Sequence, residues 1–229
     1  MCRIAIVLVL TLAVVGLGCH LYAADEARPA AAPTTIALSP PDTAGKMPLE
    51  QALAQRRSVR KYADAPITLP QLSQLLWAAQ GITDPASGHR TAPSAMATYP
   101  LRLYVFAGNV SDLPPGVYRY IPQGHKLELV VEGDQRTNAG SQPQIRSAPV
   151  LFLFTADTSA TSQRAGAARA RDWAMIEAGH AAQNILLEEV ALSLVGVPMA
   201  GYDAAKIRPL LKLPDTEEPI YILSAAKRG

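Results

Sequence analysis

The sequence predicts a single domain of the α+β class, and three observations support this. Segments with helical periodicity, at 47–57, 68–81 and 168–196, are mixed with segments of strand-like pattern. These helices and strands do not alternate regularly, as they would in a chain of βαβ units. The 229-residue chain is 49% hydrophobic, so it can bury a substantial core without disulfide bonds.

The helices have recognisable boundaries. In the segment 47–57, apolar residues recur at helical spacing before a group of arginines. Thr68 is a good N-cap for the second helix, and Pro70 lies in its first turn. The helical pattern of 168–196 is expected to end at Gly196, and a turn and a short helix are expected to follow.

Five segments predict strands. Residues 117–121 and 127–131 flank the turn "PQGH" and predict a β-hairpin. Residues 148–157 are almost wholly apolar, which indicates a strand buried on both faces. The segments 101–108 and 217–229 complete the set, the last with a basic end, while the composition of 83–100 predicts a loop.

The first 24 residues predict a signal peptide. Arg3 precedes an apolar run, Ile4 to Leu17, that is shorter than the about 20 residues a membrane-spanning helix needs. We therefore expect an exported protein, periplasmic or associated with the cell envelope. An uncleaved N-terminal anchor is one alternative, and a lipid anchor at Cys19 is another.

The next segment, 25–46, is rich in proline, alanine and threonine and shows no apolar periodicity. This composition predicts a flexible linker. The folded domain is accordingly expected to span 47–229.

Composition and motifs argue against several classes of function. A net charge of +2 is too small to suggest general nucleic-acid binding, and no nucleic-acid partner is expected. Cleavage after Cys19 would leave no cysteine to act as nucleophile or metal ligand, because Cys2 is the only other one. The histidines are scattered and no H-E-x-x-H motif occurs, so no metal site is predicted.

The segment "RRSVRK" at 56–61 concentrates positive charge in a chain where only 17% of residues are charged. A guanidinium group binds phosphate through two parallel hydrogen bonds and keeps its charge, so these arginines could hold an anion. Cations at the end of a helix are also stabilised by its dipole. The pattern alone leaves both interpretations open.

Several segments together resemble the nitroreductase-like FMN oxidoreductases, over about 47–229. They are "LEQALAQRRSVRKYADAPITLPQLSQLLWAAQGIT", "APSAMATYPLRLYVF", "EAGHAAQNILLEEVALSLVGVPMAGYD" and "EEPIYIL". "HRTAPSAMATYP", "PPGVYRY" and "EAGHAAQN" are most similar to the SagB/ThcOx-type dehydrogenase branch, which includes peptide azoline oxidases. The resemblance implies a three-layer fold, with a central, mostly antiparallel sheet flanked by helices. It also implies a homodimer that binds FMN at its interface, with the long apolar helix as a reasonable dimer core.

The resemblance also implies a cofactor site. The residues implied to hold the FMN phosphate and ribityl chain are Arg56, Arg57, Ser58, Arg60, Lys227 and Arg228. The loop implied to approach the flavin ring from the other subunit is Pro93, Ser94 and Ala95. The turn implied to face flavin N5 is Met199, Ala200 and Gly201. Taken singly, these pieces could also be an ordinary loop, a plain turn and a disordered basic tail.

Two departures from the family pattern bear on activity. Ala97 stands where many nitroreductases have an asparagine near the ring. Ala165 and Gly166 stand where the azoline-oxidising members carry a Lys-Tyr pair, which argues against azoline oxidation.

The function that the resemblance implies is that of an FMN-dependent oxidoreductase with a ping-pong cycle through flavin N5. NADH or NADPH would be the electron donor and a second small molecule the acceptor. The first alternative is an exported flavin-binding or non-catalytic module with the same fold. A less favoured one is an azoline-to-azole peptide oxidase. The sequence predicts no catalytic side chain beyond the flavin.

Overall fold

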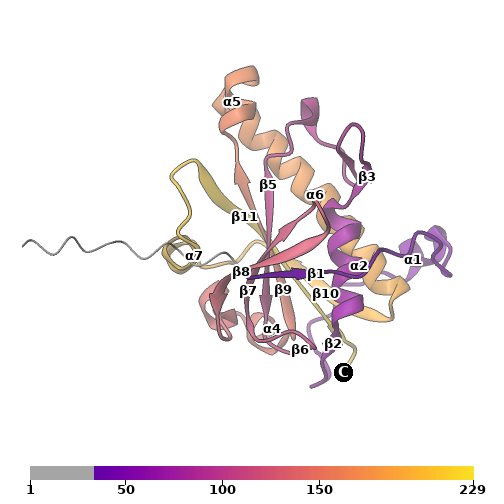
Figure 1. Ribbon diagram of the computed structural model, residues 1–229. Coiled ribbons are helices and arrows are strands. Elements are labelled where there is room, and N and C mark those ends of the chain that lie inside the picture. Colours follow the sequence, from indigo (N-terminus) through magenta and orange to yellow (C-terminus); the bar gives the residue numbers. More distant parts are fainter. Residues whose placement is uncertain (1–33) are drawn as a thin grey trace, which may run out of the picture. The chain divides into compact units, whose positions relative to one another are not determined.

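A seven-stranded sheet lies at the centre of the computed structural model, which describes residues 34–229 (Figure 1). Its strand order is β1-β8-β7-β5-β9-β11-β10, and all neighbouring strands are antiparallel. The strands are β1 (Thr35–Ala37), β5 (Leu101–Ala107), β7 (Gly116–Ile121), β8 (Lys126–Glu132), β9 (Val150–Asp157), β10 (Leu194–Met199) and β11 (Glu217–Lys227). The predicted α+β class with a mostly antiparallel sheet is confirmed.

Helices cover both faces of this sheet. They are α1 (Leu49–Gln55), α2 (Leu69–Gln80), α3 (Arg136–Ala139), α4 (Pro143–Ser147), α5 (Ser159–Ala165), α6 (Ala167–Ala191), α7 (Ala204–Leu211) and the 3-10 turn η1 (Ala95–Ala97). Phe152 and Phe154 of β9 pack in a core with α2 and α6. The alternate residues Leu151 and Leu153 pack in a second core with α3, α4 and α7. As predicted, β9 is therefore buried on both faces.

Two short strand pairs lie outside the main sheet. The parallel pair is β2 (Ile67–Thr68) with β6 (Val110–Ser111), and the antiparallel pair is β3 (Ile82–Asp84) with β4 (His89–Arg90). The segment predicted as a loop, 83–100, thus contains most of a small hairpin and the turn η1.

Helix α2 begins where the sequence predicts. The Thr68 hydroxyl accepts a hydrogen bond from the Gln71 N–H at 3.3 Å, and the Gln71 side chain accepts one from the Thr68 N–H at 3.0 Å. This capping box satisfies backbone donors that have no partner within the helix. The helix ends at Gly81, which is its C-cap.

Helix α6 is shorter than predicted, because residues 194–199 form strand β10. Ser193 has a left-handed backbone with φ 58°, which ends the helix and redirects the chain. The β-branched Val195 and Val197 then pair with β11. The prediction was wrong here because the apolar residues of the strand happen to continue the helical spacing.

The folded part begins before the expected boundary at residue 47. Strand β1, Thr35–Ala37, pairs with β8, and the Leu38 N–H donates to the carbonyl of His125 at 3.0 Å. Residues 35–38 therefore belong to the domain, although their composition predicted a linker. The predicted signal peptide at 1–24 and the possible lipid anchor at Cys19 lie outside the described residues.

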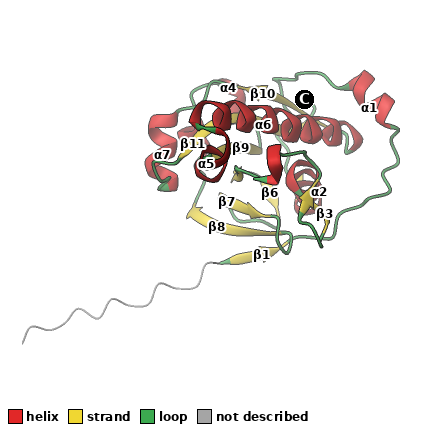
Figure 2. Cartoon of the chain, turned by 90° about the horizontal axis from the view of Figure 1, so that it is seen from above, coloured by secondary structure: helices red, strands yellow, loops and turns green. Residues whose placement is uncertain are grey.

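Helix α6 is not the apolar helix that the resemblance implied as a dimer core. Its buried residues are five alanines, Ile185, Leu186 and the two acids Glu177 and Glu189, whereas Met175 and Ile176 are exposed. Figure 2 shows α6 running across the domain, with the short helix α1 at the outer edge. None of the helices within 34–229 combines the length and hydropathy needed to cross a bilayer.

Candidate functional site

The arginine-rich segment lies against the last two strands of the sheet. Ser58 forms a parallel bridge with Gly196 of β10, and the Val59 N–H donates to the Gly196 carbonyl at 2.9 Å. Further along, the Ala63 N–H donates to the carbonyl of Lys227 at 3.0 Å. These backbone contacts place the segment that follows α1 beside the C-terminal residues, from which it is separated by more than 150 positions of sequence.

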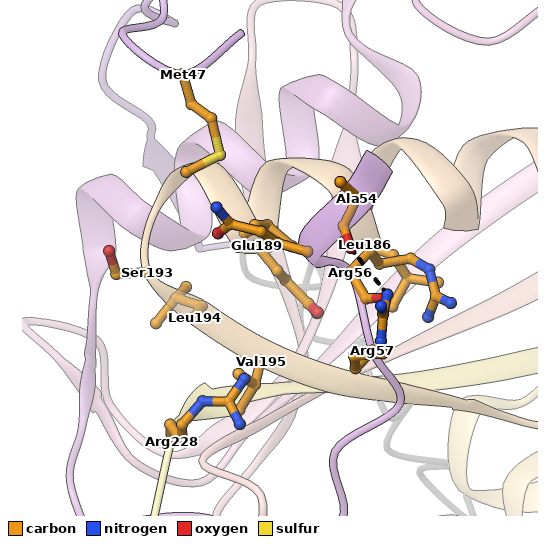
Figure 3. Close-up of a pocket in the computed structure, with 12 residues that line it drawn as sticks. Met47, Ala54, Arg56, Arg57, Leu186, Glu189, Ser193, Leu194, Val195 and Arg228 are labelled. Carbon is orange, nitrogen blue, oxygen red and sulfur yellow. Dashed lines mark hydrogen bonds between the residues drawn. The ribbon is translucent and has the colours of Figure 1, made fainter. Parts of the chain in front are cut away.

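Three predicted arginines share one cavity of about 520 Å³. Arg56 and Arg57 approach it from the end of α1, and Arg228 approaches it from the end of β11 (Figure 3). The Arg57 Nη1 donates to the carbonyls of Ala54 at 3.0 Å and Arg56 at 2.7 Å, which holds that guanidinium against the helix end. Stabilisation of the helix end and anion binding are thus compatible, because the remaining donors of Arg57 stay free for a ligand.

One buried acid lies in the wall of this cavity. Glu189 of α6 is 1% exposed, and its Oε1 has no hydrogen-bond partner among the described residues. Burial raises the pKa of this carboxyl well above its usual range, although the positive charge of Arg56 opposes the shift. Because this shift favours the neutral form of Glu189, the other charged residues of the cavity lining are the three arginines, which attract an anion.

Glycine is required where Glu189 meets the sheet. A Cβ atom on Gly196 would lie 1.9 Å from the Ser224 carbonyl and 2.6 Å from the nearer Glu189 oxygen. The absent side chain lets β10, β11, the Ser58 bridge and the buried carboxyl come together.

The other residues of the predicted phosphate group are less directly placed. Ser58 and Arg60 are exposed, and neither lines the arginine cavity. Lys227 is half-buried at the end of β11, where its carbonyl accepts the hydrogen bond from Ala63. The six residues predicted to hold the phosphate and ribityl chain therefore lie at the same edge of the sheet. Of these six, Arg56, Arg57 and Arg228 line the cavity.

The predicted N5-facing turn lies at the opposite end of β10. Met199 is the last residue of that strand and is buried in the second core, while Ala200 and Gly201 are exposed. The Gln142 amide nitrogen would lie 2.2 Å from a Cβ on Gly201, so Gly201 admits a close approach of another side chain. The turn and the arginine cavity are thus connected by one continuous strand.

The predicted ring-side loop does not line the arginine cavity in the protomer. Pro93 is exposed, and Ser94 and Ala95 are half-buried. The Tyr99 N–H donates to the Ser94 hydroxyl at 2.9 Å. Positive φ angles at Met96, 55°, and Ala97, 51°, show a backbone that is held in a sparsely populated conformation.

The family model "Nitroreductase family" matches residues 53–227, which is most of the chain. The chain belongs to the nitroreductase family. A nitroreductase-family relative from Methanocaldococcus jannaschii is 36% identical over 184 residues, covering 79% of this chain and 91% of the relative. As a member of this family, the protein is an oxidoreductase.

Solved structures show the same nitroreductase fold. A nitroreductase described from Ralstonia eutropha JMP134 has a TM-score of 0.76 at 31% identity, covering 85% of this chain and 90% of that chain. A chain of the Escherichia coli microcin synthetase complex McbBCD has a TM-score of 0.64 at 19% identity, covering 96% and 85%. At that identity, the second likeness concerns the fold alone.

A second buried acid, Glu177 of α6, was not singled out by the sequence. It is 2% exposed in this nitroreductase fold, and burial raises its pKa to about 7, against the opposing effects of Ser94 and Arg90. Glu177 is thus close to the predicted ring-side loop. The sequence did contain a sign of this residue. Glu177 falls on the same helix face as Ala174 and Ala178, so the helical periodicity places a carboxyl among apolar residues.

Residues 34–229 contain no group of three or more His, Cys, Asp or Glu side chains that could hold an ion.

Proposed function

We propose that this nitroreductase-family protein is an FMN-dependent oxidoreductase, with the flavin phosphate in the arginine cavity. The observation that carries the proposal is that Arg56, Arg57 and Arg228 line one cavity beside strand β10, where Gly196 permits close packing. Three permanently charged guanidinium groups are the donors that suit a phosphate dianion. The buried carboxyl of Glu189 is compatible with that anion because burial favours its neutral form.

Strand β10 supports the same orientation of the cofactor. From Leu194 beside the cavity to Met199 beside the exposed turn, the strand extends about 16 Å at roughly 3.3 Å per residue. This span can accommodate a ribityl chain between a phosphate at one end and a ring at the other. Ala200 and Gly201 carry little side-chain bulk, so their backbone N–H groups can approach a planar ring.

The chemistry comes from the cofactor. When bound, FMN can accept a hydride at N5 and later release it. NADH or NADPH would donate the hydride, and a second small molecule would accept the electrons in a ping-pong cycle. The protein's own residues bind the phosphate, orient the ring and limit access of water. Hydride transfer through a bound flavin would need no protein nucleophile.

We further propose that the protein acts as a homodimer, in which the loop Pro93, Ser94 and Ala95 completes the partner's flavin site. Its absence from the cavity of its own protomer is compatible with this role. The exposed apolar residues Leu49 and Leu53 of α1 would be covered in such a dimer.

The SagB/ThcOx-type assignment remains a proposal based on sequence. Azoline oxidation is not favoured, because Ala165 ends α5 and Gly166, with φ 83°, forms the junction to α6. Neither residue has a side chain able to act as a base. Assays of NADH and NADPH oxidation with quinone and nitroarene acceptors separate an active enzyme from a flavin-binding module. The module would bind flavin but would not oxidise either nucleotide.

Titration with flavins tests the binding proposal. We expect Arg57→Ala to weaken FMN binding by about 10- to 100-fold, because charge-assisted hydrogen bonds contribute about 1.5–3 kcal/mol. Riboflavin, which has no phosphate, should bind the wild type and the variant with similar affinity. Quenching of flavin fluorescence gives both dissociation constants, and Arg169→Ala on exposed α6 surface is the matched control. Equal FMN affinity in Arg57→Ala and the wild type would refute the phosphate assignment.

A further inference from the structure

A second cavity, of about 280 Å³, lies where strands β5 and β7 separate. The pairing of these strands begins at Leu103 and Tyr120, so the residues beyond that pair diverge and leave a space. Its walls combine the apolar Leu101, Leu103 and Ile121 with arginines from three different strands. The nitroreductase chemistry described above uses none of these residues.

Arg90 of β4 is fixed in place but incompletely hydrogen-bonded. Its Nη1 donates to the Gln80 side chain at 2.8 Å, and its guanidinium carbon lies 4.3 Å from the centroid of the Tyr99 ring. Its buried Nε has no partner among the described residues. Because Nη1 is used by Gln80 and Nε is closed off from solvent, Nη2 is the donor that Arg90 offers to an anion in the cavity.

Two further arginines and one buried acid set the charge around Arg90. Arg102 also lines the cavity, and its ion pair with Asp157 is long, at 3.6 Å. Burial lowers the pKa of Arg90, attraction to the carboxyl of Glu177 opposes this shift, and a smaller repulsion from Arg102 adds to it. Arg119, the third arginine, is already paired with Glu128 at 3.1 Å. An incoming anion would relieve both the desolvation of Arg90 and its repulsion from Arg102.

We propose that this cavity is a second ligand site, which binds a small organic oxyanion with an apolar body. The oxyanion, a carboxylate or a phosphate, would be held by Nη2 of Arg90 with help from Arg102. The apolar part would pack on Leu101 and Leu103. The volume equals roughly that of nine waters at about 30 Å³ each, which suits a molecule larger than an inorganic ion.

Aromatic probes of matched shape test the proposal on the full-length protein saturated with FMN. Benzoate supplies a carboxylate, phenyl phosphate supplies a phosphate, and benzamide is the neutral counterpart of benzoate. Binding is followed by the ¹⁵N resonances of arginine Nε–H groups, assigned through Arg90→Gln and Arg119→Gln. We expect benzoate or phenyl phosphate to shift the Arg90 resonance, and the anion that binds more tightly identifies the oxyanion. Benzamide should bind at least tenfold more weakly.

Substitutions separate this site from the flavin site. Arg102→Gln should weaken the probe at least fivefold, and it keeps the proposal testable if Arg90→Gln does not fold. Arg171→Gln, which removes an exposed ion pair with Glu218, is the matched control and should leave the probe affinity unchanged. Two results would overturn the proposal. One is no shift of the Arg90 resonance with either anion, and the other is a probe affinity that falls in Arg57→Ala but not in Arg102→Gln.

The outcome does not depend on the proposed function. The same titrations are repeated without added FMN in the Arg57→Ala variant, which suppresses anion binding in the arginine cavity. They give the dissociation constant of the probe at the second site independently of the flavin. A protein that fails to bind FMN but still binds benzoate through Arg90 and Arg102 would retain the second site and lose the flavin assignment.

Discussion

At the scale of single residues, the two buried acids of α6 are the groups whose behaviour is most informative. Glu189 lies in the wall of the arginine cavity, and Glu177 lies near Arg90 and Ser94. Burial raises the pKa of both carboxyls because the charged form loses its hydration. Each acid therefore connects pH to a measurable property of the protein.

Glu189→Gln should strengthen FMN binding at alkaline pH. In the wild type, Glu189 ionises as pH rises through its elevated pKa, and the new negative charge then repels the phosphate. The variant stays neutral, so its affinity relative to that of the wild type should rise, by up to about tenfold, over the pH range in which Glu189 ionises. Flavin fluorescence titrations across this range measure the ratio. A ratio that is independent of pH would contradict the role given to Glu189.

Glu177→Gln should make stability less dependent on pH. The folded-state pKa, about 7, lies above the ordinary value of 4.5, so the folded protein holds a proton that the unfolded chain releases between these values. The free energy of unfolding of the wild type should therefore fall as pH rises from about 4.5 to 7, by at most about 3 kcal/mol from this group. Above pH 7, the variant should be the more stable protein.

Urea unfolding at pH 5 and pH 8 measures this difference. Glu50→Gln, at an exposed position in the first turn of α1, is the control and should retain the pH dependence of the wild type. If the free energy of unfolding of Glu177→Gln and of the wild type falls by the same amount between the two pH values, Glu177 is not the cause of the pH dependence of stability.

At the scale of secondary-structure elements, the contact between α6 and β10 depends on Gly196. We expect Gly196→Ala to destabilise the fold by about 1–3 kcal/mol or more, because its Cβ would overlap the Ser224 carbonyl in β11. Gly179→Ala is the control, since a Cβ at that helical position meets nothing within 4 Å. It should be stabilising by about 0.5–1 kcal/mol. Thermal and urea unfolding compare the two, and similar effects would argue against the close packing at Gly196.

The elements that the sequence predicted correctly have local causes. Thr68 and Gln71 form a capping box visible in the chain, and the apolar run of β9 is what a strand buried on both faces requires. The errors have non-local causes. Strand β10 exists because β11 pairs with it, and β1 is ordered by β8. The strands β8 and β11 were predicted, but the local patterns of 194–199 and 35–37 do not indicate that they pair with these strands, and they favoured a helix in one case and a linker in the other.

The candidate site shows the same division. The arginine cluster at 56–61 was evident from composition, but its meeting with Arg228 depends on the pairing of the last strands. Family resemblance supplied that connection before the structure did. The second cavity was not predictable, because Arg90 and Arg102 belong to separate short segments and meet only where β5 and β7 diverge.

At the scale of the whole molecule, the proposed homodimer can be tested directly. Leu49 and Leu53 of α1 are 59% and 52% exposed, and Ile176 of α6 is 57% exposed. We expect light scattering to give the mass of a dimer, and Leu53→Glu to shift it toward the monomer because a charge would be buried at an apolar contact. The exposed Glu50→Gln change should leave the dimer intact. A monomeric wild type at micromolar concentration would exclude the dimer.

The most direct test of the flavin assignment is a crystal structure of the protein with FMN. The phosphate should lie within hydrogen-bond distance of Arg57 and Arg228, with the ring beside Ala200 and Gly201 at the far end of β10. A flavin bound elsewhere, or a phosphate that contacts neither arginine, would contradict the account.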